Sequence, residues 1–483
     1  MITNTDNLKR DLASLVGAEN VSSNFFKFSE YCLMHVSQKV FGINKVQPFV
    51  VVRPVTVDQL VEVVKFSYRN KIPLYVRGGG TGYSGGANPT FGGIVLEMTG
   101  LNKVLKVDKI GGYVTCQAGI SVVALNSELK KFGLWWPHDP GSREWATVGG
   151  AISTLGVGTF STRYGYAPNM VASLTLVTPE GTLVKLGSKV RHHTTMYNLI
   201  ETITSAEGTL GVIVDATLKV YKIPPSRKVG IALFDDFDST VSSCYELVSN
   251  GLYPESLMIE DVLRFVSEGL SPFFDLEDER VRSLNLDTKE AALIYSYAGE
   301  PTIVDFELRK TEELLKDKKA NIVKDLDIIN AYWKSKTELP SWPKEEGINI
   351  KIHSFVPAIP LSEASKFNRV YKQLASESGL SMTGARYYVI LPSMECTVSP
   401  SLAFNDDDPK QIEAYESFTT KFSKAVQEMG GAPSSTLGMG IRLAKVLREL
   451  TDQNELEIMW KVKKAFDPNE TFNPGRKLMR DEI

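Results

Sequence analysis

The chain has 483 residues, 43% of them hydrophobic and 23% charged, which excludes a disordered or fibrous protein and leaves room for two or three domains. A formal net charge of −3 gives no reason to expect a nucleic-acid or membrane-surface partner. The polar residues 1–10 do not open a signal peptide, and no run approaches the ~18 apolar residues of a membrane-spanning helix. We therefore expect a cytoplasmic protein without a transmembrane segment, and leave association with the inner face of the membrane open.

The first part of the chain is predicted to combine helices with short strands. Residues 1 to about 45 have a helical pattern that ends in a turn containing Gly42. Phe49–Val52 is a short buried-strand pattern, and residues 57–68 then carry apolar side chains at helical spacing. The apolar run of residues 72–76 leads into a loop that is dense in glycine.

This glycine-rich loop, Arg77–Ala87, is the most informative segment. Glycine permits positive φ and a close approach of the backbone, so consecutive N–H groups in such a loop can wrap a phosphate. Residues 80–85 fit G-x-G-x-x-G, but the dinucleotide fold with that fingerprint continues into a helix, whereas residues 93–98 have a strand pattern. The sequence therefore predicts a pyrophosphate-binding loop between two strands, for a nucleotide cofactor other than NAD.

Further along, a strand is predicted at residues 114–117, a helix at 121–132, and a hairpin whose turn is Pro179-Glu180-Gly181. Pro224-Pro225 marks the expected domain boundary. Beyond it, longer charged helices alternate with strands, the helices at 305–319, 362–379 and 407–429 and the strands at 291–298 and 349–356. We expect a first domain over 1–225, a second over 226–430, and a return to the first domain over 431–483.

Additional motifs follow the loop in a fixed order: Pro137–Ser142, Ala146–Gly150, Tyr164-Gly165, Ala206–Ile213 and, near the far end, Ala465–Asn469 with Phe472–Arg476. Together they resemble the PCMH-type FAD-binding domain of the vanillyl-alcohol oxidase superfamily, and above all its branch of glycolate oxidase D subunits, D-lactate dehydrogenases and alkyl-dihydroxyacetonephosphate synthases. The resemblance implies an α+β fold in which a two-subdomain FAD-binding domain carries a mixed α/β cap domain over the reactive face of the flavin.

The cofactor implied by this resemblance is FAD. We expect it to be non-covalent at the loop, because Thr81 stands where tethering relatives place a histidine; a tether through the cap domain is left open. The loop suits the pyrophosphate, and by resemblance the turns at 140–142 and 147–150 line the ribityl chain and the isoalloxazine. The expected FAD-binding residues are Arg77, Gly78, Gly79, Gly80, Thr81, Gly82, Ser84, Pro140, Gly141, Ser142, Thr147, Gly149, Gly150, Ser153, Gly208, Ile213, Asn473 and Arg476.

The chain departs from the metal-dependent members of this branch. They carry a G-H-x-G-D-G-N-L-H run, which corresponds here to residues 391–399. In this chain, Pro392 and Ser399 stand in place of the two histidines. The family's later G-E-H-G-I-G run corresponds here to residues 435–440, where Thr436 and Leu437 replace the glutamate and the histidine that is the family's presumed base. The side chains of proline, threonine and leucine are not ligands for Zn²⁺ or Mn²⁺, so we expect a reaction without a metal.

A carboxylate substrate requires fixed cations, and the chain offers several. Lys336 stands where relatives show the arginine of W-x-x-R, which is thought to hold the substrate carboxylate; lysine keeps the charge but loses the bidentate geometry. Lys351 matches a lysine that relatives place near the flavin. Arg386 and Arg442 are the other candidates.

The general base is harder to identify, because the chain has only five histidines. His353, on a predicted strand, is the preferred candidate, and His138 lies within a flavin-lining motif. His35 and the pair His192-His193 are interpreted as packing and loop residues. Tyr388 is an alternative, although only one of Tyr387 and Tyr388 can face a given pocket on a strand.

The expected function is FAD-dependent, metal-independent oxidation of a small D-2-hydroxy acid, such as D-lactate or glycolate, by hydride transfer to flavin N5. Two alternatives stay open: a metal-free phenol or alcohol oxidase of the vanillyl-alcohol or cresol type, and the flavin subunit of a larger electron-transfer complex. The four scattered cysteines contain no C-x-x-C and hold no iron–sulfur cluster. The expected partners are therefore a small organic substrate and an external electron acceptor, with a homodimer suggested by the family.

Overall fold

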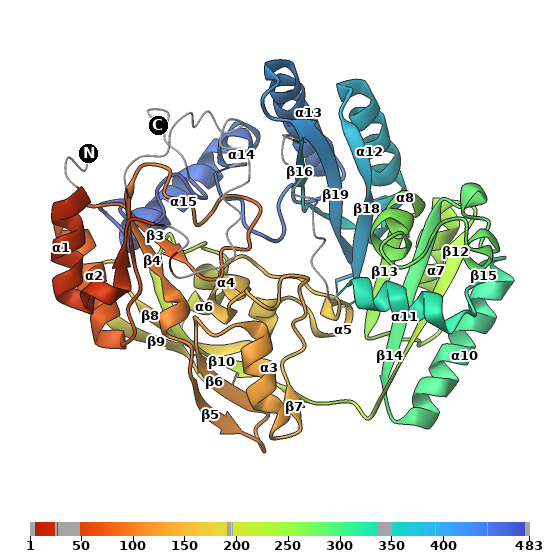
Figure 1. Cartoon of the computed structure of the whole chain (residues 1–483), viewed down its shortest axis with the longest axis horizontal. Helices are drawn as coiled ribbons and strands as arrows, with labels where there is room; N and C mark the ends of the chain where they lie inside the picture. Colours follow the sequence, from red (N-terminus) through yellow and green to blue (C-terminus); the bar gives the residue numbers. More distant parts are fainter. Residues whose placement is uncertain are drawn as a thin grey trace.

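The computed structural model describes residues 5–24, 27, 49–190, 195, 197–336, 350–391, 393–441 and 443–478, and for residues 350–354 the backbone alone. The fold is the predicted α+β arrangement of a flavin domain and a cap. Figure 1 shows two smaller sheets in one half of the molecule and one large, helix-covered sheet in the other. None of the helices in the described ranges combines the length and apolar character needed to span a bilayer.

The first small sheet positions the glycine-rich loop. Its strands are β1 (Val21–Ser22), β2 (Phe49–Val52), β3 (Leu74–Arg77) and β4 (Gly93–Glu97), in the order β1-β2-β4-β3. Strands β2 and β3 run parallel to β4, so the chain passes from β3 through the loop and back to the start of β4. Helix α2 (Val57–Asn70) connects β2 to β3 and begins at a capping box formed by Thr56 and Gln59.

The N-terminal segment is only partly helical. Helix α1 (Thr5–Val16) ends where Gly17 adopts φ of 88°, a left-handed conformation that terminates the helix without a Cβ clash. After a short 3₁₀ turn, β1 pairs antiparallel with β2, so the helix predicted over residues 1–45 is interrupted by a strand. The rest of that range, including His35 and Gly42, lies outside the described residues apart from residue 27.

The second small sheet is antiparallel throughout and has the order β5-β6-β10-β8-β9. Its strands are β5 (Val104–Asp108), β6 (Tyr113–Gln117), β8 (Val171–Val177), β9 (Leu183–Gly187) and β10 (Val212–Lys219). The predicted hairpin is β8–β9, and Gly181 takes φ of 86° in its turn. Helices α3 (Val122–Lys130), α4 (Val148–Ser153) and α6 (Leu199–Thr204) accompany this sheet, and a short pair joins β7 (Leu134–Trp135) to β11 (Tyr221–Lys222).

The cap contains an eight-stranded sheet in the order β15-β12-β14-β13-β18-β19-β16, with β17 paired to β19. The strands are β12 (Ser226–Phe234), β13 (Ser256–Asp261), β14 (Ala291–Gly299), β15 (Asn321–Ile322), β16 (Ile350–Ser354), β17 (Ala358–Pro360), β18 (Ser381–Ile390) and β19 (Glu395–Asn405). Helices α7 (Phe237–Ser249), α10 (Pro301–Asp317), α12 (Ala364–Ser378) and α13 (Pro409–Glu428) bury one face in a large apolar core. The other face meets α11 (Leu326–Ser335) and a π-helical turn, Phe265–Leu270.

The chain then returns to the flavin half, where α14 (Ala444–Leu450) and α15 (Gln453–Phe466) lie in Figure 1. The segment after α15 reaches β3 directly. Leu74 donates its N–H to the carbonyl of Thr471 and accepts from the N–H of Asn473, at 2.8 Å in both cases. The two ends of the described chain thus build one site.

Candidate active site

The glycine-rich loop is packed so closely that side chains would not fit. A Cβ atom at Gly79 would lie 1.8 Å from the carbonyl oxygen of Trp145, and one at Gly78 would lie 2.2 Å from Oγ1 of Thr147. Gly80 has φ of 67°, and a Cβ there would lie 2.2 Å from Nη2 of Arg77. These positions let backbone N–H groups approach a ligand, as a pyrophosphate cradle requires.

A buried ion pair lies beneath the loop. Arg77 Nη1 is 2.5 Å from Glu97 Oε2, and each side chain is only 1% exposed. Because Arg77 ends β3 and Glu97 ends the parallel strand β4, the pair joins the two strands at the edge where the loop leaves the sheet. The sequence prediction placed Arg77 among the cofactor residues; Glu97 was not identified.

The loop borders a cavity of about 1210 Å³, part of it open to solvent. The cavity extends between the loop, the segment 138–157, the segment 207–213 and the C-terminal residues 436, 437 and 473. The predicted cofactor residues that line it are Arg77, Gly78, Gly79, Gly80, Thr81, Gly82, Pro140, Ser142, Thr147, Gly149, Gly150, Ser153, Gly208, Ile213 and Asn473. The structure therefore brings together segments that are almost 400 residues apart in the sequence.

The three other predicted cofactor residues, Ser84, Gly141 and Arg476, are not part of the cavity lining. Ser84 donates its hydroxyl to the carbonyl of Gly438 at 2.6 Å, and Gly141 lies beside the backbone of Lys336. Arg476 is 2% exposed and donates to the carbonyls of Gly85 and Gly86, at 3.1 and 3.2 Å. It also donates to Thr90 Oγ1 at 3.1 Å and to the carbonyl of Asn88, so one guanidinium fixes the shape of the loop.

Glu207 and Asn473 connect the cavity to the C-terminal segment. The Glu207 carboxylate accepts hydrogen bonds from the N–H groups of Met439 and Gly440, at 2.8 and 2.9 Å. Asn473 accepts from the N–H of Val76 at 2.8 Å and donates to the carbonyl of Glu207. Glu207 lies within the sequence motif Ala206–Ile213, which was the available signal, but its bonding partners are more than 200 residues away.

His138 lies in the cavity wall. Its ring is 4.9 Å from that of Trp136, and the residue is 2% exposed. Burial lowers the pKa of His138 to about 3, so the imidazole is neutral at physiological pH. The sequence left open whether this histidine reaches the active site, and the structure places it at the flavin cavity.

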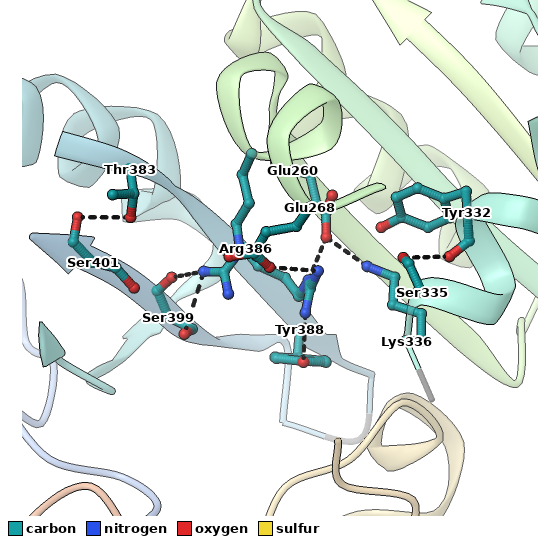
Figure 2. Close-up of polar contacts among 11 residues, drawn as sticks. Glu260, Glu268, Tyr332, Ser335, Lys336, Thr383, Arg386, Tyr388, Ser399 and Ser401 are labelled. Carbon is teal, nitrogen blue, oxygen red and sulfur yellow. Dashed lines mark hydrogen bonds and ion pairs between the residues drawn. The ribbon is translucent and has the colours of Figure 1, made fainter. Parts of the chain in front are cut away.

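A second polar group lies on the cap sheet, on the face opposite the large apolar core (Figure 2). Glu260 on β13 stands in register with Arg386 on β18, and Glu260 Oε1 accepts from Arg386 Nε. Lys336, at the end of α11, donates to the same oxygen at 2.6 Å. The structure thus unites two predicted cations, Lys336 and Arg386, around a carboxylate that the sequence prediction missed.

The group continues beyond Glu260. Arg386 Nη2 is 3.4 Å from Glu268 Oε2, and Arg264 Nε is 3.0 Å from the same atom. Arg264 also donates to the carbonyl of Ser399 on β19. We call Arg264, Lys336, Arg386, Glu260 and Glu268 the cap charge cluster; with Lys336 protonated, its three cations and two carboxylates leave one positive charge in excess.

Burial and charge act in opposite directions on Glu260 and Lys336. Burial would raise the pKa of Glu260, but Arg386, Lys336 and Arg264 hold it well below its ordinary value. Burial and the charge of Arg386 lower the pKa of Lys336 to about 7, although Glu260 opposes this shift. Glu260 is therefore an anion throughout the physiological range, whereas Lys336 titrates near neutrality.

The two adjacent tyrosines of β18 point to opposite faces, as strand alternation predicts. Tyr387 is buried in the large core, and its hydroxyl donates to Asn368 Oδ1 at 3.2 Å. Tyr388 shares the face of the cap charge cluster, and its hydroxyl lies 3.5 Å from Arg386 Nη1. Of the two tyrosines, Tyr388 is the one next to the cations.

The structure does not describe the side chains of the remaining candidate catalytic residues. Lys351 and His353 lie on β16, but their side chains are outside the description, and Arg442 and His192-His193 lie outside the described residues altogether. Within the described ranges, no group of three or more histidine, cysteine, aspartate or glutamate side chains has the arrangement of a metal site.

Fold and cavity define a flavoprotein of the PCMH-type architecture. Residues 48–187 match the FAD binding domain family, and residues 223–476, more than half of the chain, match the FAD linked oxidases through their C-terminal domain. The chain belongs to the FAD-linked oxidases, and its cofactor is FAD. The closely packed glycines and the cavity fit such a dinucleotide.

Named relatives cover almost the whole chain. A D-lactate dehydrogenase of Anaerostipes hadrus is 27% identical over 92% of this chain and 91% of its own length. The glycolate oxidase subunit GlcD of Bacillus subtilis is 24% identical, with 99% and 98% covered. Among solved structures, p-cresol methylhydroxylase has a TM-score of 0.77 at 17% identity, covering 99% of this chain and 97% of that one. An alkyldihydroxyacetonephosphate synthase has a TM-score of 0.74 at 20% identity, covering 98% and 86%. The structural likenesses show the fold.

Proposed function

We propose that this protein oxidises a small D-2-hydroxy acid, of the D-lactate or glycolate type, in an FAD-dependent and metal-independent reaction. The observation that carries the proposal is the cap charge cluster, which has one positive charge in excess when Lys336 is protonated and in which the Lys336 backbone lies beside the turn 140–142. The position of Lys336 supports this, because a Cβ at Gly141 would lie 4.0 Å from the Lys336 carbonyl oxygen, and the neighbouring residues Pro140 and Ser142 line the cavity. A monoanionic substrate matches this excess.

Within the cluster, Arg386 is the group best suited to hold the substrate carboxylate. Its side chain is 12% exposed, whereas those of Lys336 and Glu260 are 3% and 0% exposed. A guanidinium can bind a carboxylate through two parallel hydrogen bonds. Glu260, which also pairs with Lys336, then holds Arg386 in place. We retain Lys351 and Arg442 as further candidate cations.

FAD, when bound, accepts the hydride that leaves the carbon bearing the hydroxyl group. The protein must orient that carbon, exclude water and accept the hydroxyl proton. The substitution of Pro392, Ser399, Thr436 and Leu437 at the metal-binding positions of the relatives supports an organic, metal-independent solution.

The proposal is tested by anaerobic mixing of the EDTA-treated holoenzyme with D-lactate, L-lactate and glycolate. We expect the visible absorption of the flavin to bleach with D-lactate or glycolate and more slowly with L-lactate. Persistence of the oxidised spectrum with all three acids overturns the substrate assignment. Bleaching that disappears with EDTA and returns with a divalent metal overturns metal independence.

A second candidate is a phenol or alcohol oxidase of the vanillyl-alcohol type. The observation that favours it is the 3.5 Å separation of the Arg386 guanidinium from the Tyr388 hydroxyl, a pair that suits stabilisation of a phenolate. Bleaching by 4-hydroxybenzyl alcohol and not by the hydroxy acids identifies this alternative.

We also infer that electrons leave FAD for an acceptor outside the chain, such as a quinone or a carrier protein, because the cysteine pattern provides no iron–sulfur cluster. Similarity to a protein named as a glycolate oxidase subunit supports a role as the flavin subunit of a complex. Copurification of an iron–sulfur protein tests the complex, and the mass of the purified protein in solution tests a homodimer.

A further inference from the structure

A polar row lies at the start of β19. Glu395, Thr397 and Ser399 alternate with Cys396 and Val398, which are buried in the large core. Strand alternation therefore places the three polar side chains on the opposite face. Their cross-strand partners Ile390, Tyr388 and Arg386 share that face, so the row continues the cap charge cluster.

Tyr166, from the flavin half of the chain, reaches this row. Its hydroxyl donates to Glu395 Oε1 and lies 3.3 Å from Thr397 Oγ1. The residue that follows it, Ala167, donates its N–H to the carbonyl of Gly156 at 2.9 Å, and Gly156 lines the flavin cavity. Tyr166 thus joins the cavity wall to the cap sheet.

The pair has the properties of a proton relay. Burial, together with the hydrogen bond to Glu395, raises the pKa of Tyr166, so the phenol stays protonated at physiological pH. A phenol that donates to a carboxylate can still accept a hydrogen bond through its oxygen. Tyr166 and Glu395 are both half-buried, whereas Thr397 is fully buried.

We propose that Tyr166 and Glu395 form the proton-accepting pair of the reaction. The substrate O–H bond breaks as Tyr166 takes that proton, the original Tyr166 O–H bond breaks as Glu395 takes its proton, and the C–H bond is cleaved as hydride, with its electron pair, to FAD. The products are a carbonyl compound, a protonated Glu395 and reduced FAD. This assignment rests on the proposed oxidation of a hydroxyl group and names its base.

The spacing of the row suits a 2-hydroxy acid. Arg386 pairs with Ser399, and Tyr166 contacts Thr397, two residues away on the same strand. Two residues of a strand span about 6.8 Å. In the proposed orientation, the substrate carboxylate binds at Arg386 and its neighbouring hydroxyl is directed along β19 toward Tyr166.

The test uses the holoenzyme variants Y166F and E395Q, with Y164F as the matched control. Tyr164 also donates to a carboxylate, Glu255 Oε1 at 3.2 Å, and burial likewise raises its pKa, but Arg227 neutralises that glutamate. Rapid mixing with substrate under anaerobic conditions gives the rate constant of flavin reduction at saturation. We expect Y166F and E395Q to lower it by about 10²-fold, the lower end for a lost acid–base group.

Two features separate a relay from a structural contact. Because the two residues act as one unit, the double variant should be no slower than either single variant. FAD content should remain that of the wild type, and Y164F should reduce at the wild-type rate. Wild-type reduction rates in Y166F, or additive losses in the double variant, overturn the relay.

A binding measurement without turnover completes the test. 2-Hydroxyisobutyrate has the hydroxyl and the carboxylate but no hydrogen on the central carbon, so it cannot be oxidised, and isobutyrate lacks the hydroxyl. Titration of the oxidised flavin spectrum should show a preference for the hydroxy acid that falls by about tenfold in Y166F, the effect of one lost hydrogen bond. A wild-type protein without this preference, or a Y166F variant that keeps it, contradicts the relay.

These outcomes are independent of the substrate proposal. If D-lactate and glycolate fail to bleach the flavin and 4-hydroxybenzyl alcohol succeeds, the hydroxy-acid assignment falls. The benzylic hydroxyl must still lose a proton, so the same variants and the same rate comparison then decide the relay with that alcohol.

Discussion

Lys336 and Glu260 form an ion pair in which Nζ lies 2.6 Å from Oε1, and the two side chains are 3% and 0% exposed. Arg386 binds the same oxygen, so one carboxylate is shared by two cations. Such a pair contributes little net stability when both partners are present, but the loss of one partner leaves a buried charge without compensation. We therefore expect the loss of Glu260 and the loss of Lys336 to lower the free energy of unfolding unequally.

The first prediction follows from this inequality. Glu260→Gln leaves Lys336 and Arg386 side by side without their shared anion, and we expect it to lower the free energy of unfolding by about 3–5 kcal/mol. Lys336→Met leaves Glu260 paired with Arg386 and should lower the free energy of unfolding by clearly less. Urea unfolding of the two holoenzyme variants measures the difference, and equal losses would contradict the shared-anion description.

The second prediction concerns pH. The pKa of Lys336 is about 7 in the folded protein and about 10.4 in an unfolded chain. Between these values the unfolded state binds a proton that the native state has released, so stability rises with pH across this window and the penalty is largest below it. Subtracting the pH profile of Lys336→Met from that of the wild type isolates the effect, because Glu260, Arg386 and Tyr332 around the amine are unchanged. A flat difference would show that Lys336 keeps its proton.

The third prediction concerns the glycine-rich loop. Gly79→Ala and Gly80→Val place a Cβ 1.8 Å from the Trp145 carbonyl and 2.2 Å from Arg77, so both variants should purify without FAD. Gly133→Ala is the matched control, because Gly133 has φ of 69° but no atom within 4 Å of a Cβ. It should keep FAD despite similar backbone strain. The ratio of flavin to protein absorbance is the measurement, and full flavin content in Gly80→Val would overturn the placement of the pyrophosphate.

The fourth prediction concerns Arg476. Truncation to alanine removes the donor shared by the carbonyls of Gly85, Gly86 and Asn88. The Gly85 and Asn88 carbonyls keep a backbone donor, whereas the Gly86 carbonyl loses its partner, and an acceptor left unpaired costs about 1–3 kcal/mol. We expect weaker FAD binding and a lower unfolding midpoint. Arg476→Lys, which restores one donor group, should recover part of both quantities, and no recovery by lysine would argue against this role in holding the loop.

Local signals in the sequence predicted much of the flavin half. Neighbouring residues determine the glycine-rich loop between β3 and β4, the β8–β9 hairpin turn and helix α2. The order of the motifs then indicated the fold through the family resemblance. Residues 1–45 were mispredicted in part, because Gly17 ends the helix and β1 then finds a partner strand in β2. A two-residue strand has no periodicity from which to recognise it.

The cap site was predicted less completely, for a physical reason. The resemblance indicated Lys336, and its charge made Arg386 a candidate, but their counterion Glu260 is 126 residues from Arg386 and meets it only through the register of β13 and β18. Tyr166 and Glu395 are separated by 229 residues and meet across the two halves. A carboxylate in an ordinary strand pattern has no local feature that distinguishes a buried partner from a solvated one.

The return of the chain to β3 has a consequence for biosynthesis. Leu74 is hydrogen-bonded to residues 471 and 473, and the loop carbonyls are held by Arg476, so the nucleotide cradle lacks one wall until these residues have left the ribosome. N-terminal segments emerge first during translation and must wait for this closure. We therefore expect stable FAD binding only after residues 471–476 have been translated and have joined β3 and the glycine-rich loop.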